Sequence, residues 1–418
     1  MKFNIWKDCP KVPITELLSF IVDNRGKTVP TADDGWKLIA TNCVTNNTLF
    51  PVYEKVRYLT QETYETWFRA HPIPGDILFV NKGTPGRVCL VPDPVDFCIA
   101  QDMIALRADD EKIYNKYLLA VLRSWKIQQQ IYNTNVGDVI PHFKKQFMDQ
   151  LLIPVPDRRI QEVIGNLYYE LSYKTELNKK INKNLAKQIK TICIAWLSDY
   201  APFGGILPDN WSKTPLSSIA DFVSGYSYKG AELTESNIAM ATIKNFNRKG
   251  GFKLDGYKEI IPSNKLKDAQ HAELFDTLVA HTDLTQNAEV IGNAEPVMSK
   301  SGYSDIVFSM DLVKVVPKNN HISKFLIAAI LQDKKFKAHC LGYVNGTTVL
   351  HLSKKALPEY QLYLPNDLSA LKPLDELVTA LYLQISANIE EITKLETLRD
   401  TLLPKLMSGD LDVSDIDL

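Results

Sequence analysis

The stretch Gly137-Asp-Val-Ile-Pro-His142, followed by Lys144-Lys145, returns in the second half of the chain as Gly346-Thr-Thr-Val-Leu-His351, followed by Lys354-Lys355. The two glycines, the two histidines and the pair Lys145 and Lys354 are each 209 residues apart. An internal repeat at a constant spacing indicates that one structural unit occurs twice. We therefore interpret the chain as a duplicated and diverged fold.

The segments upstream of this stretch also recur. Tyr117-Leu-Leu-Ala120 matches Phe325-Leu-Ile-Ala328 at an offset of 208 residues. The short runs Asp76-Ile-Leu-Phe-Val80 and Asp276-Thr-Leu-Val-Ala280 are rich in β-forming residues and lie between polar, Gly- and Pro-containing loops. Each half is therefore expected to be a mixed α/β (α+β) globular domain.

A seven-residue apolar period follows each globular half. In the first helix the expected seam comprises Ile160, Ile164, Leu167, Leu171, Lys174, Asn178, Ile181, Leu185, Gln188 and Ile192. In the second it comprises Leu371, Leu374, Val378, Leu381, Ile385, Asn388, Ile392, Leu395, Arg399, Leu402 and Leu406. Alternating three- and four-residue steps over about five heptads are typical of a coiled coil.

The two seams predict an antiparallel pair with a defined register. Aligning them in opposite directions brings Ile164 to Leu402 and Leu185 to Leu381, and it places Asn178 opposite Asn388. A buried asparagine pair fixes register, because a slipped register leaves amides without partners. Pairing within one chain requires no second copy and is the preferred interpretation, with pairing between two chains as the alternative. It predicts an internal pseudo-two-fold repeat, with two globular domains separated by a rod of about 54 Å.

Length and composition exclude several classes of protein. The chain has 418 residues and 45% hydrophobic residues, which is enough for more than one core. The apolar run Phe325–Leu331 is too short to cross a bilayer, and the first residues contain no apolar signal region. The six cysteines form no Cys-x-x-Cys pair. We expect a cytoplasmic protein with reduced thiols and no membrane contact.

The net charge of −1 is unlike that of a globally basic DNA-binding protein. Lys plus Arg number 18 against 17 Asp plus Glu in residues 1–150, 8 against 5 in 151–205, 18 against 16 in 206–365, and 4 against 11 in 366–418. The near-neutral total therefore combines mildly basic regions with an acidic C-terminal segment. Opposite charges on the two long helices favour their pairing, although exposed ion pairs contribute little each.

Basic, amide-rich loops provide candidate nucleic-acid contacts in both halves. These loops are Asn24-Arg-Gly-Lys27, Asn81-Lys-Gly-Thr-Pro-Gly-Arg87 and Lys244-Asn-Phe-Asn-Arg-Lys-Gly-Gly251. Lys and Arg neutralise phosphates, whereas Arg, Asn and Gln carry the forked donors and acceptors that read base edges. Any one of these loops is also compatible with an ordinary solvated turn.

Catalytic motifs are missing from the sequence. There is no Walker loop, no G-x-G-x-x-G after a strand, and no Ser/His/Asp or Cys/His set that stands out. Asp93-Pro-Val-Asp-Phe97 only partly matches the Asp/Asn-Pro-Pro-aromatic element of amino-group methyltransferases. His339 beside Cys340 lacks the second pair of ligands that a zinc site requires. The sequence predicts a non-catalytic protein that binds no metal or cofactor of its own.

The chain as a whole resembles the specificity subunits of type I restriction-modification systems. Leu398-Arg-Asp-Thr-Leu-Leu-Pro-Lys-Leu-Met-Ser-Gly409 is similar to the distal conserved region of that family, and Leu207-Pro-Asp-Asn-Trp211 resembles the start of a target-recognition domain. Gly75-Asp-Ile-Leu-Phe79 with Gly83-Thr-Pro-Gly86 resembles a motif inside such domains. The second half departs from this motif, with Ala280-His-Thr-Asp-Leu-Thr285, which suggests that the two domains read different DNA sequences.

The resemblance implies a division of the chain into four parts and a set of partners. The parts are recognition domain 1 (1–157), a central helical region (158–205), recognition domain 2 (206–366) and a C-terminal helical region with an acidic tail (367–418). In the family, each recognition domain reads half of a bipartite site in double-stranded DNA. The coiled coil sets the unread spacer, and the helical regions dock methyltransferase subunits, of which we expect two.

The resemblance also places the chemistry on other subunits. Methyltransferase subunits that use S-adenosylmethionine and restriction-translocase subunits that use ATP and Mg are expected as partners. A rod-shaped adaptor that binds protein rather than DNA is the alternative function. An adaptor would show no salt-dependent affinity for duplex DNA.

Individual contacts are predicted from residue type. The candidates for base readout are Arg25, Lys27, Asn81, Lys82, Thr84 and Arg87 in the first domain, and Tyr226, Lys229, Lys244, Asn245, Asn247, Arg248 and Thr282 in the second. Lys144, Lys145, Lys354 and Lys355 are candidates for phosphate contacts, because a point charge positions DNA without specifying its sequence.

Overall fold

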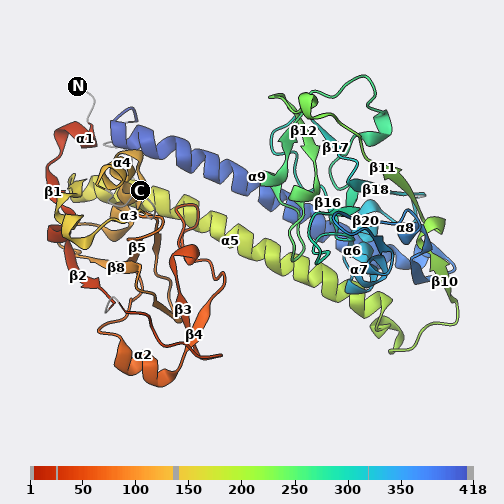
Figure 1. Cartoon of the computed structure of the whole chain (residues 1–418), viewed down its shortest axis with the longest axis horizontal. Coiled ribbons are helices and arrows are strands. Elements are labelled where there is room, and N and C mark those ends of the chain that lie inside the picture. Colours follow the sequence, from red (N-terminus) through yellow and green to blue (C-terminus); the bar gives the residue numbers. More distant parts are fainter. Residues whose placement is uncertain (1–3, 25–26, 135–140, 319, 412–418) are drawn as a thin grey trace. The chain divides into compact units, whose positions relative to one another are not determined.

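The computed structural model describes residues 4–24, 27–134, 141–318 and 320–411, and the chain forms two compact units. Unit 1 comprises Met1–Leu177 and Lys394–Leu418, and unit 2 comprises Asn178–Thr393. Each unit contains a globular part and part of each of the two long helices, α5 (Arg158–Leu197) and α9 (Lys372–Ser408). These helices can be followed in yellow-green and blue in Figure 1.

Unit 1 is built on a four-stranded antiparallel sheet of order β2-β8-β5-β6. Its strands are β2 (Leu18–Val22), β8 (Met103–Ala108), β5 (Ile77–Val80) and β6 (Val88–Leu90). A three-stranded sheet has the order β4-β3-β7, from β4 (Arg57–Leu59), β3 (Trp36–Ile39) and β7 (Phe97–Ile99), and β1 (Lys11–Pro13) pairs with β9 (Leu152–Pro154). The short helices are α1 (Ile5–Asp8), α2 (Gln61–Trp67), α3 (Asn115–Arg123) and α4 (Trp125–Asn133).

Strand β5 shows how the sheet of unit 1 separates two layers of core. All four of its side chains are buried. Successive side chains of a strand point to opposite faces. Ile77 and Phe79 accordingly pack into the core that contains α3 and α4, whereas Leu78 and Val80 pack into the core shared with β3 and β7. A strand buried on both faces reads as a continuous apolar run, which is why this segment was recognisable in the sequence.

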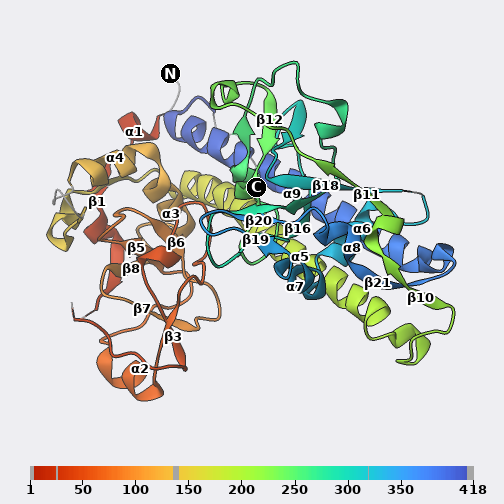
Figure 2. The same ribbon diagram turned by 45° about the vertical axis from the view of Figure 1, so that its right-hand side comes forward.

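Unit 2 repeats this topology. Its four-stranded sheet has the order β11-β18-β14-β16, from β11 (Ala220–Ser224), β18 (Leu312–Pro317), β14 (Thr277–Ala280) and β16 (Ala294–Pro296). A three-stranded sheet has the order β13-β12-β17, from β13 (Lys258–Glu259), β12 (Ile238–Ala241) and β17 (Asp305–Phe308), and β10 (Trp211–Pro215) pairs with β21 (Gln361–Pro365). A third sheet, β15-β20-β19, comprises β15 (Thr282–Asp283), β20 (Leu350–Leu352) and β19 (Val344–Asn345). Figure 2 labels β19 and β20 together with α6 (Lys324–Leu331), α7 (Lys334–Leu341) and α8 (Ala356–Glu359).

The equivalence of the two units extends to strand direction. In both three-stranded sheets the central strand pairs antiparallel on one side and parallel on the other, as β3 does with β4 and β7 and β12 does with β13 and β17. The predicted mixed α/β class and the internal duplication are therefore confirmed.

The long helices pack antiparallel within each unit. In unit 1, Ile164 and Tyr168 of α5 share a core with Leu406 and Met407 of α9. In unit 2, Ile189 and Cys193 of α5 share a core with residues of α9 that include Leu374, Val378 and Tyr382. In unit 1 the start of α5 therefore packs against the end of α9, and in unit 2 the end of α5 packs against the start of α9. The predicted antiparallel pairing is confirmed.

Gly165 permits the close approach of α5 to α3 in unit 1. A β-carbon at this position would lie 2.6 Å from the backbone nitrogen of Tyr117, which is inside van der Waals contact. The backbone of α3 could move only with the core residues that follow Tyr117. A glycine is therefore required where the central helix meets the globular part of unit 1.

The predicted register of the helix pair needs correction. Asn178 and Asn388 are both buried, but they bond to other partners. Asn178 donates to Glu391 Oε2 at 2.8 Å, and Asn388 donates to Asn182 Oδ1 at 2.7 Å. Asn388 thus meets a residue one helical turn along α5 from its expected partner.

The predicted seam of α5 is also wrong at three positions. Lys174, Ile181 and Gln188 are exposed, and the neighbouring Thr175, Asn182 and Ile189 are buried or half-buried instead. The predicted seam of α9, in contrast, is buried or half-buried at every position. Burying the polar ends of lysine and glutamine side chains is costly, which fits the exposed placement of Lys174 and Gln188.

All six cysteines are free thiols, as the spacing of cysteines in the sequence predicted. No helix in the described part of the chain is long and apolar enough to cross a membrane.

Candidate nucleic-acid interface

In unit 1, the loop after β5 lies against the segment that begins at Pro141. Gly83 N donates to Pro141 O at 2.9 Å, Phe143 N donates to Asn81 O at 2.8 Å, and Lys82 forms a β-bridge with His142. This junction brings the loop Asn81–Arg87 and the Lys144-Lys145 pair together, although they are far apart in the sequence. The basic groups predicted separately therefore belong to one surface region.

The first predicted loop also borders this region of unit 1. Asp23 forms an ion pair with Lys145, which places the end of β2 beside the lysine pair. Lys27 is exposed beyond it, whereas Arg25 lies outside the described residues, as do residues 137–140 of the repeated stretch.

Unit 2 forms the same junction from the equivalent segments. Thr282 pairs with His351 between β15 and β20, and Leu352 N donates to His281 O at 2.9 Å. The exposed Lys354 and Lys355 come one residue after the end of β20. The repeated His-x-x-Lys pattern of the sequence thus corresponds to the same structural junction in each unit.

The loop Lys244–Gly251 of unit 2 borders a hollow of about 480 Å³. Lys244, Asn247 and Arg248 line it from the loop. On the other side it is lined by Asp283 at the end of β15 and by Leu284 and Glu289 after that strand. Arg248 forms an ion pair with Glu289 at 3.0 Å. The side chain of Arg248 is 68% exposed, and an ion pair in that setting contributes little, so an anionic ligand can compete for the guanidinium.

Most predicted contact residues are accessible. The exposed or half-exposed members are Lys27, Lys82, Thr84, Arg87, Lys144, Lys145, Lys229, Lys244, Asn247, Arg248, Lys354 and Lys355. They lie in loops or directly beside short strands, which is where binding groups are usually found.

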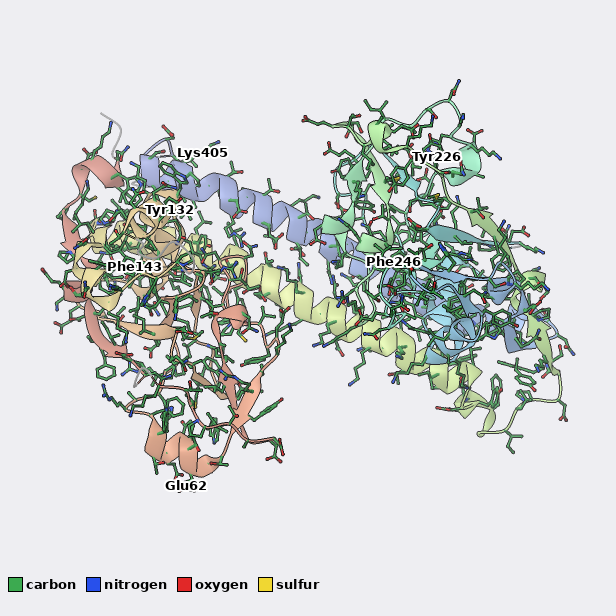
Figure 3. All side chains as sticks on the ribbon, in the orientation of Figure 1. Glu62, Tyr132, Phe143, Tyr226, Phe246 and Lys405 are labelled. Carbon is green, nitrogen blue, oxygen red and sulfur yellow. The ribbon has the colours of Figure 1, made fainter. Side chains whose placement is uncertain are left out.

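Four predicted contact residues lie in the interior instead. Asn81 donates to Phe143 O at 3.3 Å, and Thr282 lies in the strand pair beside His351. Tyr226, labelled in Figure 3, donates from its hydroxyl to Glu232 at 2.7 Å. Asn245 is fully buried and joins the two ends of its loop, accepting from Thr242 N and donating to Lys253 O. These side chains hold the loops and do not face solvent.

The histidines at the junctions were not among the predicted contact residues. His142 and His351 occupy equivalent positions, and the constant spacing of the repeat was the signal that could have identified them. Burial lowers the pKa of the neighbouring His281, and the nearby His351 and Lys354 lower it further. His281 is therefore neutral at physiological pH and adds no positive charge to the surface.

The carboxylates beside the hollow were also missed. Burial raises the pKa of Asp283, but hydrogen bonds from Val290, Thr285 and Ile291 outweigh this effect and bring the pKa below its ordinary value. Asp283 is therefore ionised and holds the segment that faces the loop. No group of three or more metal-ligating side chains occurs among the described residues.

The sequence matches a known family over its first half. Residues 14–187 match the type I restriction modification DNA specificity domain. The MjaIX type I restriction enzyme specificity subunit of Methanocaldococcus jannaschii is 21% identical over 366 residues, which cover 82% of this chain and 79% of that protein. The MjaVIII specificity subunit of the same organism is 20% identical over 334 residues, which cover 76% and 75% of the two proteins.

The fold is similar to that of a solved structure. The type I restriction-modification system S subunit from M. genitalium matches with a TM-score of 0.58 at 18% identity, and the match covers 97% of this chain and 98% of that chain. The likeness therefore extends over both units and both long helices.

Proposed function

We propose that this chain is a specificity subunit of a type I restriction-modification system, because residues 14–187 match the DNA specificity domain of that family, and that each unit reads one half of a bipartite, asymmetric site in duplex DNA. A specificity subunit is a non-catalytic component that recognises DNA. Methylation with S-adenosylmethionine and translocation with ATP and Mg then belong to partner subunits.

The observation that carries this proposal is the repeated junction. The segment after β5 in unit 1 and the segment after β14 in unit 2 each pair with the segment that contains the repeated histidine. Exposed lysines follow that histidine in both units. Lys144, Lys354 and Lys355 are exposed, and their charges suit phosphate contacts. Two equivalent basic junctions in one chain suit two half-sites.

Base readout is proposed to come from the loops that differ between the units. In unit 2, Asn247 and Arg248 line the hollow and offer an amide and a guanidinium, which have the forked geometry that base edges require. In unit 1, Lys82, Thr84 and Arg87 occupy the shorter loop after β5. The two loops follow different strands of the shared framework, β12 in unit 2 and β5 in unit 1, and they would read two different half-site sequences.

The long helices are proposed to set the unread spacer and to dock two methyltransferase subunits. An apolar surface in unit 1 supports a docking role for the end of α9. A cavity of about 360 Å³ is lined there by Leu403, Pro404 and Met407 together with Trp125, whose ring is largely exposed. Tyr132 and Lys405, both labelled in Figure 3, are further exposed residues of this unit.

The salt dependence of binding tests the proposed DNA contact. The double variant Lys144→Ala/Lys354→Ala, assembled with its partner subunits, should bind duplex DNA more weakly. The slope of log K against log salt should fall in magnitude by about two, because each lost phosphate contact removes about 0.9 from it. Fluorescence anisotropy with a labelled duplex at several salt concentrations measures this slope.

A matched pair of lysines provides the control. Lys112 in unit 1 and Lys213 in unit 2 are also exposed but belong to neither junction, so Lys112→Ala/Lys213→Ala should leave the slope unchanged. A wild-type complex whose affinity for duplex DNA does not depend on salt would overturn the proposed function and favour a protein-binding adaptor.

A further inference from the structure

A buried carboxylate connects the loop Lys244–Gly251 to helix α9 within unit 2. Glu295 in β16 is 5% exposed. Its Oε1 accepts a hydrogen bond from Gly251 N at 2.6 Å, and its Oε2 accepts one from Gln332 Nε2 at 2.8 Å. Gln332 in turn accepts a hydrogen bond from the hydroxyl of Tyr382 in α9 at 2.8 Å. A continuous chain of hydrogen bonds therefore runs from the end of the loop to the long helix.

This carboxylate anchors the glycine end of the loop. Gly250 and Gly251 both have positive φ angles, 90° and 104°, so the loop ends in backbone that has no side chains to anchor it. A second attachment comes from Asn293, two residues before Glu295, which donates to Asn247 O at 3.1 Å. Lys337 in turn donates to Asn293 Oδ1 at 2.6 Å. The exposed Arg248 lies between these two attachments in the sequence, directly after Asn247.

We propose that Glu295 is a positioning residue for DNA reading by unit 2. It holds the loop Lys244–Gly251 in the reading geometry through the hydrogen-bonded chain Gly251–Glu295–Gln332–Tyr382. This inference rests on the proposed function of unit 2. Glu295 is buried and touches no DNA. It acts through the loop backbone, and it links the geometry of that loop to α9.

The surroundings of Glu295 make its protonation depend on pH near neutrality. Burial raises its pKa to about 7, although the hydrogen bonds from Gly251 and Gln332 act in the opposite direction. Tyr382, which faces it from α9, and Cys193, which faces Tyr382 from α5, have pKa values raised by burial and are neutral in this range. A protonated carboxyl accepts hydrogen bonds more weakly than a carboxylate, so the loop should be held less firmly at low pH.

The test uses the complex of the full chain with its partner subunits. Binding is measured to its own duplex site and to duplexes with one base pair changed in either half, at pH 6.0 and pH 8.5. The half read by unit 2 is the one whose discrimination falls in the Arg248→Ala complex. For the wild type, discrimination in that half should be higher at pH 8.5 by about tenfold, the value of one charge-assisted hydrogen bond.

Two substitutions separate positioning from general stability. Glu295→Gln keeps the volume of the side chain but does not titrate, so discrimination in the unit 2 half should become independent of pH. Glu295→Ala should lower that discrimination at pH 8.5 by about tenfold and leave the other half unchanged. Glu273→Gln is the control, because Glu273 is an exposed carboxylate that pairs with Lys300 in the same unit.

The outcomes distinguish this inference from the proposed function. A Glu295→Gln complex that keeps the pH profile of the wild type overturns the positioning role, and so does a Glu295→Ala complex in which both halves lose discrimination equally. A wild-type complex that discriminates in neither half overturns the proposed function itself. If Glu295→Ala does not fold, the pH profile of Glu295→Gln alone decides.

Discussion

Lys244 and Asn245 are neighbours in one loop, yet their side chains have opposite placements. Lys244 is exposed beside the hollow, whereas Asn245 is fully buried and closes the loop through Thr242 and Lys253. Both residue types can contact nucleic acid, so composition alone could not separate them. An asparagine beside a turn can bond to its own backbone, and this local bond decided its role.

The buried carboxyl of Glu295 should make the stability of unit 2 depend on pH. Its pKa is raised from 4.5 to about 7, so the folded chain holds this proton more tightly than the unfolded chain. Below pH 4.5 the carboxyl is protonated in both the folded and the unfolded chain, so its burial does not lower the free energy of unfolding. As pH rises from 4.5 through about 7, the free energy of unfolding falls by roughly 3 kcal/mol in total.

Glu295→Gln removes this dependence. Relative to the wild type, the variant should gain unfolding free energy between pH 5 and pH 8, as measured by urea denaturation at each pH. Glu273→Gln should show no such gain, because Glu273 is largely exposed. Equal pH dependence in the wild type and Glu295→Gln would contradict the assignment of a raised pKa to this group.

At the scale of elements, the two long helices differed in how well the sequence predicted them. The seam of α9 could be predicted because every heptad position of the seam is buried or half-buried. In α5 the expected seam included Lys174 and Gln188, and the helix instead turns Thr175 and Ile189 inward. Periodicity locates a helix face to within about one residue, and packing against the globular parts decides among the candidates.

The amides between α5 and α9 should make the pair in unit 2 sensitive to single substitutions. Asn388 donates to Asn182, and Gln384 donates to Asn388 at 2.8 Å. Asn388→Leu leaves Asn182 with an unpaired oxygen, so thermal unfolding should show a loss of about 1–3 kcal/mol.

The double variant Asn182→Leu/Asn388→Leu removes both amides and should recover most of this loss, because two apolar groups replace a polar pair. A double variant that is less stable than Asn388→Leu would contradict this account of the polar contact.

At the scale of the whole molecule, the duplication was the most predictable property. The 209-residue repeat predicted two similar units, and the matching strand orders β2-β8-β5-β6 and β11-β18-β14-β16 confirm them. The contacts that make each reading loop distinct were not predictable. They depend on partners far away in the sequence, such as Glu295 and Gln332 for Gly251.

The helix pair is expected to control the distance between half-sites. Inserting one heptad into the middle of α5 and one at the matching place in α9 preserves the seam and lengthens the pair by about 10 Å. The length of the unread spacer should change, and both half-site sequences should be retained. Mapping of methylated sites measures both, and an unchanged spacer would contradict the expectation.

The central claim is that two units of one chain read two separate half-sites. Sequencing of methylated adenines tests it most directly, in cells that carry the partner subunits with either the wild-type chain or Lys244→Ala/Asn247→Ala/Arg248→Ala. The account predicts a bipartite motif for the wild type, and for the variant a motif in which one half is relaxed and the other half and the spacer are unchanged. A continuous motif, or relaxation of both halves together, would contradict it.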